Sequence, residues 1–295
     1  MSEEMVEITV DGETIDVSAG STILAVLRAE GIDTPTICWA ENLTPVNVCR
    51  ACVVEVEGSR TLVPSCSRPV ESGMVIHTDS ERVRHSRRMV LEFLATANDL
   101  SEADEIREWA TRYGADSTRY PESAARVDEP PRRQDELYVR DYDKCVQCYK
   151  CIEACGDDAQ HTFAIAVSGR GFESRISTEF DVALPDSACV YCGNCVGVCP
   201  TNALVFTTEF DLRRAGVWKP DAQTVTRTVC SYCGVGCNLD LHVQDDRIVK
   251  VTSPADHEAA SGPERVTLDG ARRPVGTDAG MLCIKGRFGW TYVHA

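Results

Sequence analysis

The sixteen cysteines of this 295-residue chain fall into four separate groups of four. The groups are Cys38, Cys49, Cys52 and Cys66; Cys145, Cys148, Cys151 and Cys155; Cys189, Cys192, Cys195 and Cys199; and Cys230, Cys233, Cys237 and Cys283. So many cysteines would suggest a disulfide framework only in a secreted chain. An iron–sulfur cluster with four thiolate ligands uses cysteines in fours. The count therefore predicts four clusters with no cysteine left over.

The chain carries a formal net charge of −16 and begins with the acidic run Met1-Ser2-Glu3-Glu4. This start lacks the basic and apolar stretches of a secretory leader, and no apolar run approaches the roughly 18 residues that span a bilayer. We therefore expect a cytoplasmic protein with no membrane span, where clustered cysteines usually bind metal. The acidic charge argues against a nucleic-acid partner. It either favours a partner with a basic docking face or only keeps the protein soluble.

The N-terminal segment predicts a small α+β domain. Apolar and polar residues alternate on both sides of Asp11-Gly12, which is a strong tight-turn signal, so we expect a β-hairpin there. Ser21 can cap a helix after the hairpin, and the valines of 53–56 predict a further strand.

A second helix is expected after Thr78, because Thr78 and Glu81 fit a capping box. Its apolar residues share one side, and Arg87 is among the arginines placed elsewhere on it. Residues 99–144 are rich in charge of both signs and contain Pro130-Pro131, which disfavours a continuous helix. We expect a short helix and a linker over this stretch.

The second and third groups each have the spacing C-x2-C-x2-C-x3-C, which is the run of bacterial two-cluster ferredoxins. Three close thiolates hold one 4Fe–4S cluster, and the fourth crosses to the other cluster. The predicted ligand sets are Cys145, Cys148, Cys151 and Cys199 for one cluster, and Cys189, Cys192, Cys195 and Cys155 for the other. The long gap from Cys155 to Cys189 predicts an inserted hairpin. Structural zinc at paired CxxC motifs is the alternative, but it does not explain the third close cysteine in each run.

The first group resembles the 2Fe–2S domain that begins the large peripheral subunit of complex I, iron hydrogenases and NAD-linked formate dehydrogenases. The likeness lies in Pro35-Thr36-Ile37-Cys38, Cys49-Arg50-Ala51-Cys52 and Pro64-Ser65-Cys66. It implies one 2Fe–2S cluster, with zinc again as the alternative. Many of these relatives hold a further 4Fe–4S cluster with one histidine and three cysteines. This chain has no cysteine between Cys66 and Cys145, so we expect that cluster to be missing.

The fourth group resembles the N-terminal 4Fe–4S domain of molybdopterin oxidoreductases, most closely formate dehydrogenases. The motifs are C-x2-C-x3-C from Cys230 and then Cys283-Ile284-Lys285-Gly286-Arg287-Phe288. The resemblance implies that Lys285 is a cofactor-binding residue between cluster and pterin, as a buried cation that stabilises the negative cluster and shapes the electron path. The other possibility is a solvated lysine. The chain ends at Ala295, before the long pterin-binding region of that family. We therefore expect the catalytic centre on a separate subunit, or a fragment of a longer chain.

Together these likenesses imply a multi-domain α+β iron–sulfur protein. We expect a β-grasp 2Fe–2S ferredoxin-like domain at 1–80, a helical linker at 81–137, a two-cluster ferredoxin domain at 138–212, and a partial molybdopterin oxidoreductase-type domain at 222–295.

The implied function is an electron-transfer subunit of a molybdenum or tungsten formate dehydrogenase. The expected partners are a molybdopterin-binding catalytic subunit and a flavin- and NAD-binding diaphorase subunit, because no dinucleotide fingerprint or P-loop is present here. The same motifs leave open an iron–sulfur subunit of a nitrate reductase or hydrogenase. A zinc-binding scaffold protein is the alternative of another class.

Overall fold

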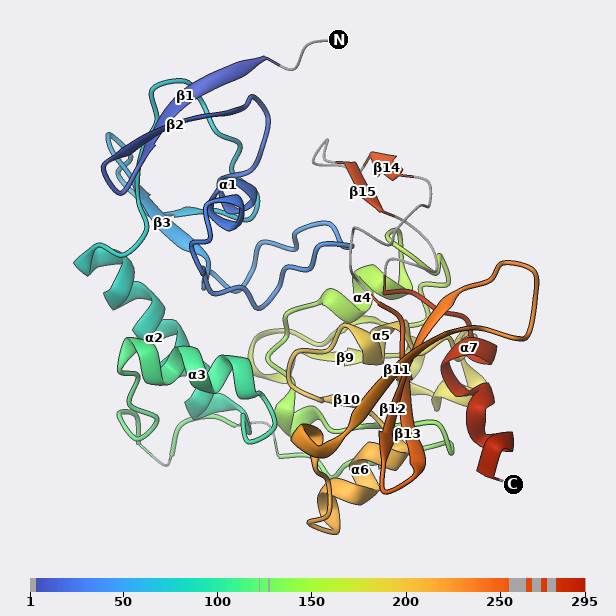
Figure 1. The fold of residues 1–295 in the computed structure, drawn as a ribbon. Coiled ribbons are helices and arrows are strands. Elements are labelled where there is room, and N and C mark those ends of the chain that lie inside the picture. Colours follow the sequence, from blue (N-terminus) through green and yellow to red (C-terminus); the bar gives the residue numbers. More distant parts are fainter. Residues whose placement is uncertain are drawn as a thin grey trace. The chain divides into compact units, whose positions relative to one another are not determined.

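The computed structural model describes residues 4–121, 123–126, 128–254, 264–266, 272–274 and 280–294 (Figure 1). The chain divides into two compact units. Unit 1 comprises Met1–Trp39 and Pro45–Arg126, and unit 2 comprises Ala40–Thr44 and Val127–Ala295. Among the described residues, no helix is both long enough and apolar enough to cross a membrane.

Unit 1 combines a mixed five-stranded sheet with three helices. Its elements are β1 (Met5–Val10), β2 (Glu13–Ser18), α1 (Ile23–Ala29), β3 (Val53–Val56), β4 (Val63–Pro64), β5 (Val75–His77), α2 (Glu81–Ala97) and α3 (Asp104–Tyr113). The strand order is β2-β1-β5-β3-β4, with β1 and β5 parallel. The predicted hairpin is confirmed: Val10 pairs with Glu13, and Asp11 and Gly12 form the two-residue turn with φ of 48° and 94°. Positive φ at both turn residues matches the right-handed twist of the strands.

Helices α1 and α2 begin one and two residues later than the sequence suggests. Thr22, not Ser21, caps α1 by accepting a hydrogen bond from the Ala25 amide. Ser80, not Thr78, caps α2 in the same way through the Val83 amide. The predicted capping box at Thr78 is therefore wrong.

The polar side predicted for α2 is also incomplete, because Arg87 is buried. It donates to the Tyr113 hydroxyl at 2.6 Å and to the Val53 carbonyl at 2.9 Å. These two bonds tie α2 to α3 and to the strand that follows Cys52.

Unit 2 is built from short strands, short helices and tight turns. Its helices and strands are β6 (Arg132–Arg133), β7 (Tyr138–Arg140), α4 (Lys150–Cys155), β8 (Ala166–Ser168), β9 (Arg175–Ser177), α5 (Asn194–Gly197), β10 (Leu204–Phe206), α6 (Thr207–Arg214), β11 (Thr224–Val229), β12 (Asn238–Gln244), β13 (Arg247–Thr252), β14 (Glu264–Val266), β15 (Arg272–Pro274) and α7 (Ile284–Phe288). Its 3₁₀ helices are η1 (Tyr142–Lys144), η2 (Gly171–Glu173), η3 (Glu179–Asp181), η4 (Leu184–Asp186), η5 (Pro220–Ala222) and η6 (Gly289–His294). β8 and β9 pair as the hairpin predicted between Cys155 and Cys189.

Two sheets position the cysteine-bearing segments of unit 2. β10, β7 and β6 form one antiparallel sheet, and β11, β12 and β13 form another. Phe288 at the end of α7 belongs to the same buried cluster as Tyr138 and Phe206 of the first sheet. The C-terminal cysteine motif and the ferredoxin-type runs therefore share one core.

Candidate metal centres

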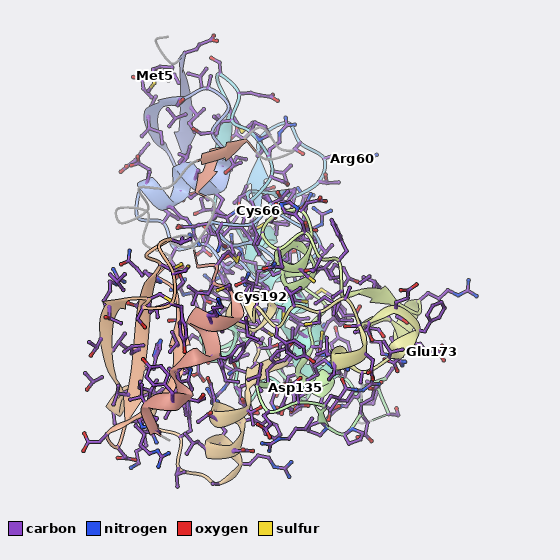
Figure 2. The ribbon with its side chains drawn as sticks, turned by 90° about the vertical axis from the view of Figure 1, so that its right-hand side faces the viewer. Met5, Arg60, Cys66, Asp135, Glu173 and Cys192 are labelled. Atoms are coloured by element: carbon purple, nitrogen blue, oxygen red, sulfur yellow. The ribbon has the colours of Figure 1, made fainter. Side chains whose placement is uncertain are left out.

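The first cysteine group lies in unit 1 around the loop that follows α1, with Cys66 labelled in Figure 2. Cys38, Cys52 and Cys66 are buried, and Cys49 is partly buried. The Cys49 amide donates to Cys38 Sγ at 3.4 Å, and the Ala51 amide donates to Cys49 Sγ at 3.5 Å. Asn47 and Arg50 take positive φ of 62° and 58°, which lets the loop turn tightly around the sulfur atoms.

The four thiols of this group form two close pairs. A hydrogen bond from the Cys49 thiol lowers the pKa of Cys38 to about 6. A hydrogen bond from Cys66 likewise lowers the pKa of Cys52 to about 7. The pKa values of the donors Cys49 and Cys66 are raised, first by these bonds and then by burial. The structure therefore brings all four predicted ligands together, with two of them already favouring the thiolate form that binds metal.

The second and third groups interleave in unit 2. A negative charge on Cys199 raises the pKa of Cys145, Cys148 and Cys151, after the larger effect of burial. Burial brings the pKa of Cys145 to about 11 and that of Cys148 to about 12. Cys199 thus lies close to the second group, although its sequence run is the third.

The reciprocal crossing is made by Cys155. Burial is again the largest effect on Cys192 and Cys195, and their pKa values are raised further by charges on Cys155 and Cys189. Cys155 thus lies close to Cys192 and Cys195 of the third group, although its sequence run is the second.

A cavity marks the second of these sets. Cys155, Cys189, Cys192 and Cys195 all line it, together with apolar Ile165, Ile176 and Leu184. Around it, the Ala164 amide donates to Cys155 Sγ at 3.3 Å, and the Tyr138 hydroxyl lies 3.1 Å from Cys189 Sγ. Four thiols facing one apolar space with hydrogen-bond donors at its edge fit a buried 4Fe–4S cluster.

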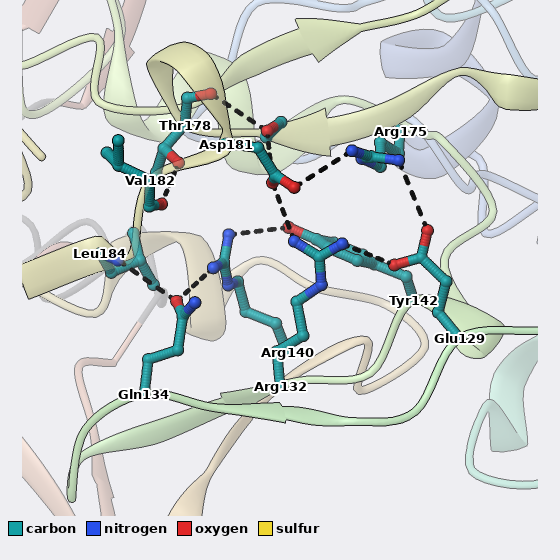
Figure 3. Close-up of polar contacts among 11 residues, drawn as sticks. Glu129, Arg132, Gln134, Arg140, Tyr142, Arg175, Thr178, Asp181, Val182 and Leu184 are labelled. Atoms are coloured by element: carbon teal, nitrogen blue, oxygen red, sulfur yellow. Dashed lines mark hydrogen bonds and ion pairs between the residues drawn. The ribbon is translucent and has the colours of Figure 1, made fainter.

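The wall of this cavity is held by a polar network (Figure 3). Arg140, which lines the cavity, donates to the Gln134 side chain and to the Tyr142 hydroxyl. Asp181 binds Arg132 at 2.8 Å and Arg175 at 3.1 Å, which anchors the β8–β9 insertion to β6. The insertion therefore closes one side of the cavity.

The fourth group is more open. Cys230 and Cys237 are buried and joined by a backbone hydrogen bond of 2.8 Å, whereas Cys233 and Cys283 are exposed. Cys283 precedes α7, and a Cβ on Gly286 one turn later would lie 3.8 Å from Cys230 Sγ. In the described ranges no three Cys, His, Asp or Glu side chains meet closely enough to hold a single metal ion.

The cations of α7 differ from the sequence expectation. Lys285, expected as a buried cation, is exposed in this chain. Arg287, two residues later, is fully buried. Nothing in the sequence pattern singled out Arg287, since an arginine in a glycine-rich segment is usually solvated.

Three family models match this chain. The model described as a 2Fe–2S iron–sulfur cluster binding domain matches residues 3–81, a 4Fe–4S binding domain matches 185–205, and the molybdopterin oxidoreductase Fe4S4 domain matches 223–295. These three segments contain the first, third and fourth cysteine groups in full.

Curated relatives cover nearly the whole chain. A subunit of an NADH-quinone oxidoreductase of Rhizobium meliloti is 28% identical over 298 residues, and the alpha subunit of the NADPH-Fe(3+) oxidoreductase of Geobacter sulfurreducens is 30% identical over 296. A candidate formate dehydrogenase of Staphylococcus haemolyticus is 25% identical over 344 residues. The matches cover 99%, 99% and 100% of this chain, but only 32% of each relative, so the chain spans about a third of their length.

A solved structure supports the fold. A crystal structure of the NAD⁺-reducing [NiFe]-hydrogenase in the H2-reduced state matches with a TM-score of 0.60 and 27% identity, covering 68% of this chain and 87% of that one. Motif order, geometry and these relatives agree. The chain contains, in order, a 2Fe–2S cluster binding domain, a 4Fe–4S ferredoxin domain and a molybdopterin oxidoreductase Fe4S4 domain, and it is a homologue of iron–sulfur subunits of oxidoreductases, among them an NADH-quinone oxidoreductase.

Proposed function

We propose that this chain is the electron-transfer part of a cytoplasmic, molybdenum- or tungsten-dependent formate dehydrogenase. It binds one 2Fe–2S and three 4Fe–4S clusters through its sixteen cysteines. It relays electrons from a metal–pterin catalytic subunit, or a following catalytic region, to a flavin subunit that reduces NAD.

The observation that carries the proposal is the crossed gathering of thiols in unit 2. Cys199 joins the second group and Cys155 joins the third, as a two-cluster ferredoxin requires. The Fe4S4 domain at 223–295 then connects this relay to a molybdopterin enzyme. Among relatives matched over the full chain, three from Staphylococcus are named as candidate formate dehydrogenases, which supports formate as the substrate.

When bound, the clusters supply reversible one-electron transfer. The residues of this chain hold them, exclude water and place donors on their sulfur atoms. Apolar Ile165, Ile176 and Leu184 keep the cavity of the third group dry, and the amide of Ala164 neutralises part of the charge on Cys155. Lys285 stays exposed on α7, where a pterin-binding surface is expected to meet it.

A second candidate is the iron–sulfur part of an NAD(P)H oxidoreductase with a different final substrate. Two relatives that match 99% of the chain are named for NADH-quinone and NADPH-Fe(3+) activities. An NADP-reducing hydrogenase subunit of Solidesulfovibrio fructosivorans is 37% identical, but its match covers only 68% of this chain.

Anaerobic purification with metal, sulfide and partner analysis tests the proposal. We expect about 14 irons per chain, matched by acid-labile sulfide, and a visible charge-transfer absorption. Cys283→Ser is expected to remove about four irons, while Thr208→Ser, a neutral control, leaves the count unchanged. Zinc without sulfide would refute the cluster assignment. Formate, added together with the co-purified partners, is expected to reduce the clusters. If only NAD(P)H reduces them, the second candidate is favoured.

A further inference from the structure

Arg287 is a cation without a matching anion. Its guanidinium is fully buried and donates to Asn194 Oδ1 at 3.1 Å, to the Gly280 carbonyl at 3.3 Å and to the Val251 carbonyl at 3.4 Å. These acceptors are neutral, and the Nε–H group has no acceptor. Within the described ranges no carboxylate pairs with it. A buried charge is retained only where something nearby compensates it.

The compensation comes from the third cysteine group. Asn194, whose Oδ1 accepts from Arg287 at 3.1 Å, stands between Cys192 and Cys195 in the sequence. The guanidinium, which is always charged in proteins, therefore lies against the turn that carries these two thiols. Its unsatisfied Nε–H fits an environment that contains a cluster.

Two glycines make the close approach possible. A Cβ on Gly193 would lie 2.9 Å from Arg287 Cγ, and a Cβ on Gly197 would lie 3.4 Å from its terminal nitrogens. Gly193 also takes φ of +70°. The turn that carries Cys192 and Cys195 therefore has no side chains where the arginine lies.

The other ferredoxin run lacks this arrangement. In the equivalent spacing, Tyr149 stands in place of Gly193 and Glu153 in place of Gly197. Lys150 replaces Asn194 and is only partly buried. The nearby buried Lys144 is neutralised by an ion pair with Asp141. Arg140 is a second buried arginine whose partners, Gln134 and Tyr142, are neutral, and it lines the cavity of Cys155, Cys189, Cys192 and Cys195.

A phenol adds to the asymmetry. Tyr138 is buried with its hydroxyl 3.1 Å from Cys189 Sγ. A metal-bound cysteine is a thiolate and only accepts, so the phenol is the donor of this hydrogen bond in the loaded site.

We propose that Arg287, aided by Tyr138, makes the site of Cys155, Cys189, Cys192 and Cys195 the more easily reduced half of the ferredoxin pair. This inference rests on the proposed cluster binding. Reduction adds one negative charge to a site in a low-dielectric interior, and a fixed cation and a donor there stabilise the reduced form. The C-terminal domain therefore sets a property of the ferredoxin domain through a single side chain.

A redox titration of the anaerobic holoprotein, followed by electron paramagnetic resonance, tests this. Dithionite supplies the electron, and no protein bond forms or breaks. Cys148→Ser marks the signal of the other cluster. Arg287→Gln is expected to lower the equilibrium constant for reduction at the site of Cys155, Cys189, Cys192 and Cys195 at least tenfold. For one electron this is about 59 mV. Arg287→Lys should have a smaller effect. The exposed Arg170→Gln removes an equal charge in solvent and should leave both constants within about twofold.

Unchanged constants in Arg287→Gln, or an equal shift of both clusters, would overturn the inference while leaving cluster binding intact. Absence of clusters from the wild-type protein would instead refute the proposed function. If Arg287→Gln loses iron, Tyr138→Phe tests the inference instead. In a Tyr138→Phe protein with a full iron count, the reduction equilibrium constant of the site of Cys155, Cys189, Cys192 and Cys195 should fall about threefold or more. An unchanged constant at that site would contradict the inference.

Discussion

Glu209 on α6 is a buried carboxylate whose two oxygens are both occupied. Its side chain is 2% exposed. Oε1 accepts from Arg213 at 2.9 and 2.7 Å, and Oε2 accepts from Lys250 of β13 at 2.8 Å. Asp211, two residues later, pairs with Arg133 at 3.0 Å, but both side chains of that pair are about half exposed. The two acidic residues form a matched comparison on one helix.

Removing one partner of a buried ion pair costs about 3–5 kcal/mol, because the other charge stays buried without compensation. Arg213 and Lys250 keep 21% exposure, so water takes up part of the loss and Glu209→Ala should cost about 3 kcal/mol. Both cations also lie over the ring of Trp218, at 5.2 and 5.1 Å, and would repel each other once the carboxylate is gone. Asp211→Ala should cost about 0.2–1 kcal/mol.

Urea unfolding of the anaerobic holoprotein, followed by circular dichroism with iron content checked for each variant, gives the two free energies of unfolding. We expect Glu209→Ala to be less stable than Asp211→Ala by about 2 kcal/mol or more. Glu209→Gln, which keeps the shape but loses the charge, should fall between them. Losses within about 0.5 kcal/mol of each other would show that burial of Glu209 does not give its ion pairs extra weight.

Three further outcomes follow from the structure. Burial, and then the charge of Lys250, lowers the pKa of His242 from 6.5, so the unfolded chain gains a proton first as pH falls. The free energy of unfolding should therefore decrease from pH 7 toward pH 5, by at most about 1.4 kcal/mol per pH unit from this group. In urea unfolding across this range, His242→Gln should show a shallower dependence of that free energy on pH. An unchanged dependence would contradict the role of His242. Ser80→Ala should cost about 1 kcal/mol in thermal unfolding through loss of the α2 cap, and no cost would contradict the cap. In urea unfolding, Phe288→Ala should lower the free energy of unfolding by about 3–5 kcal/mol. Phe172 is 89% exposed, so Phe172→Ala should lower it by less than about 0.5 kcal/mol. Equal losses in the two variants would contradict the burial of Phe288.

Local features of this fold were predictable because their causes are local. Asp11 and Gly12 form the hairpin turn because that dipeptide tolerates positive φ at both positions. The spacing of each cysteine run predicts which thiols share a cluster, because three cysteines at intervals of three can face one cluster. The fourth ligand of each set is predicted only by the repeated pattern.

The misassigned cap of α2 shows where sequence reasoning ends. Thr78 has the right residue type and spacing, but its hydroxyl and amide both bind Asp11, which lies 67 residues earlier. Ser80 is then the first residue free to cap the helix. Such competition depends on tertiary contacts, which a local motif cannot reveal.

The burial of Arg287 could not be predicted for the same reason, because it too depends on tertiary contacts. A charged side chain in a sequence is expected at the surface, and only Gly193 and Gly197, about ninety residues earlier, create the space that buries it. The Leu282 amide and Arg287 both bind Asn194 Oδ1, so one side chain of the third group orients the whole segment after Cys283. A substitution at Asn194 would then disturb the fourth cysteine group as well as the third. The residues that join the third and fourth cysteine groups in this chain are thus not the cysteines themselves but the polar and small residues between them.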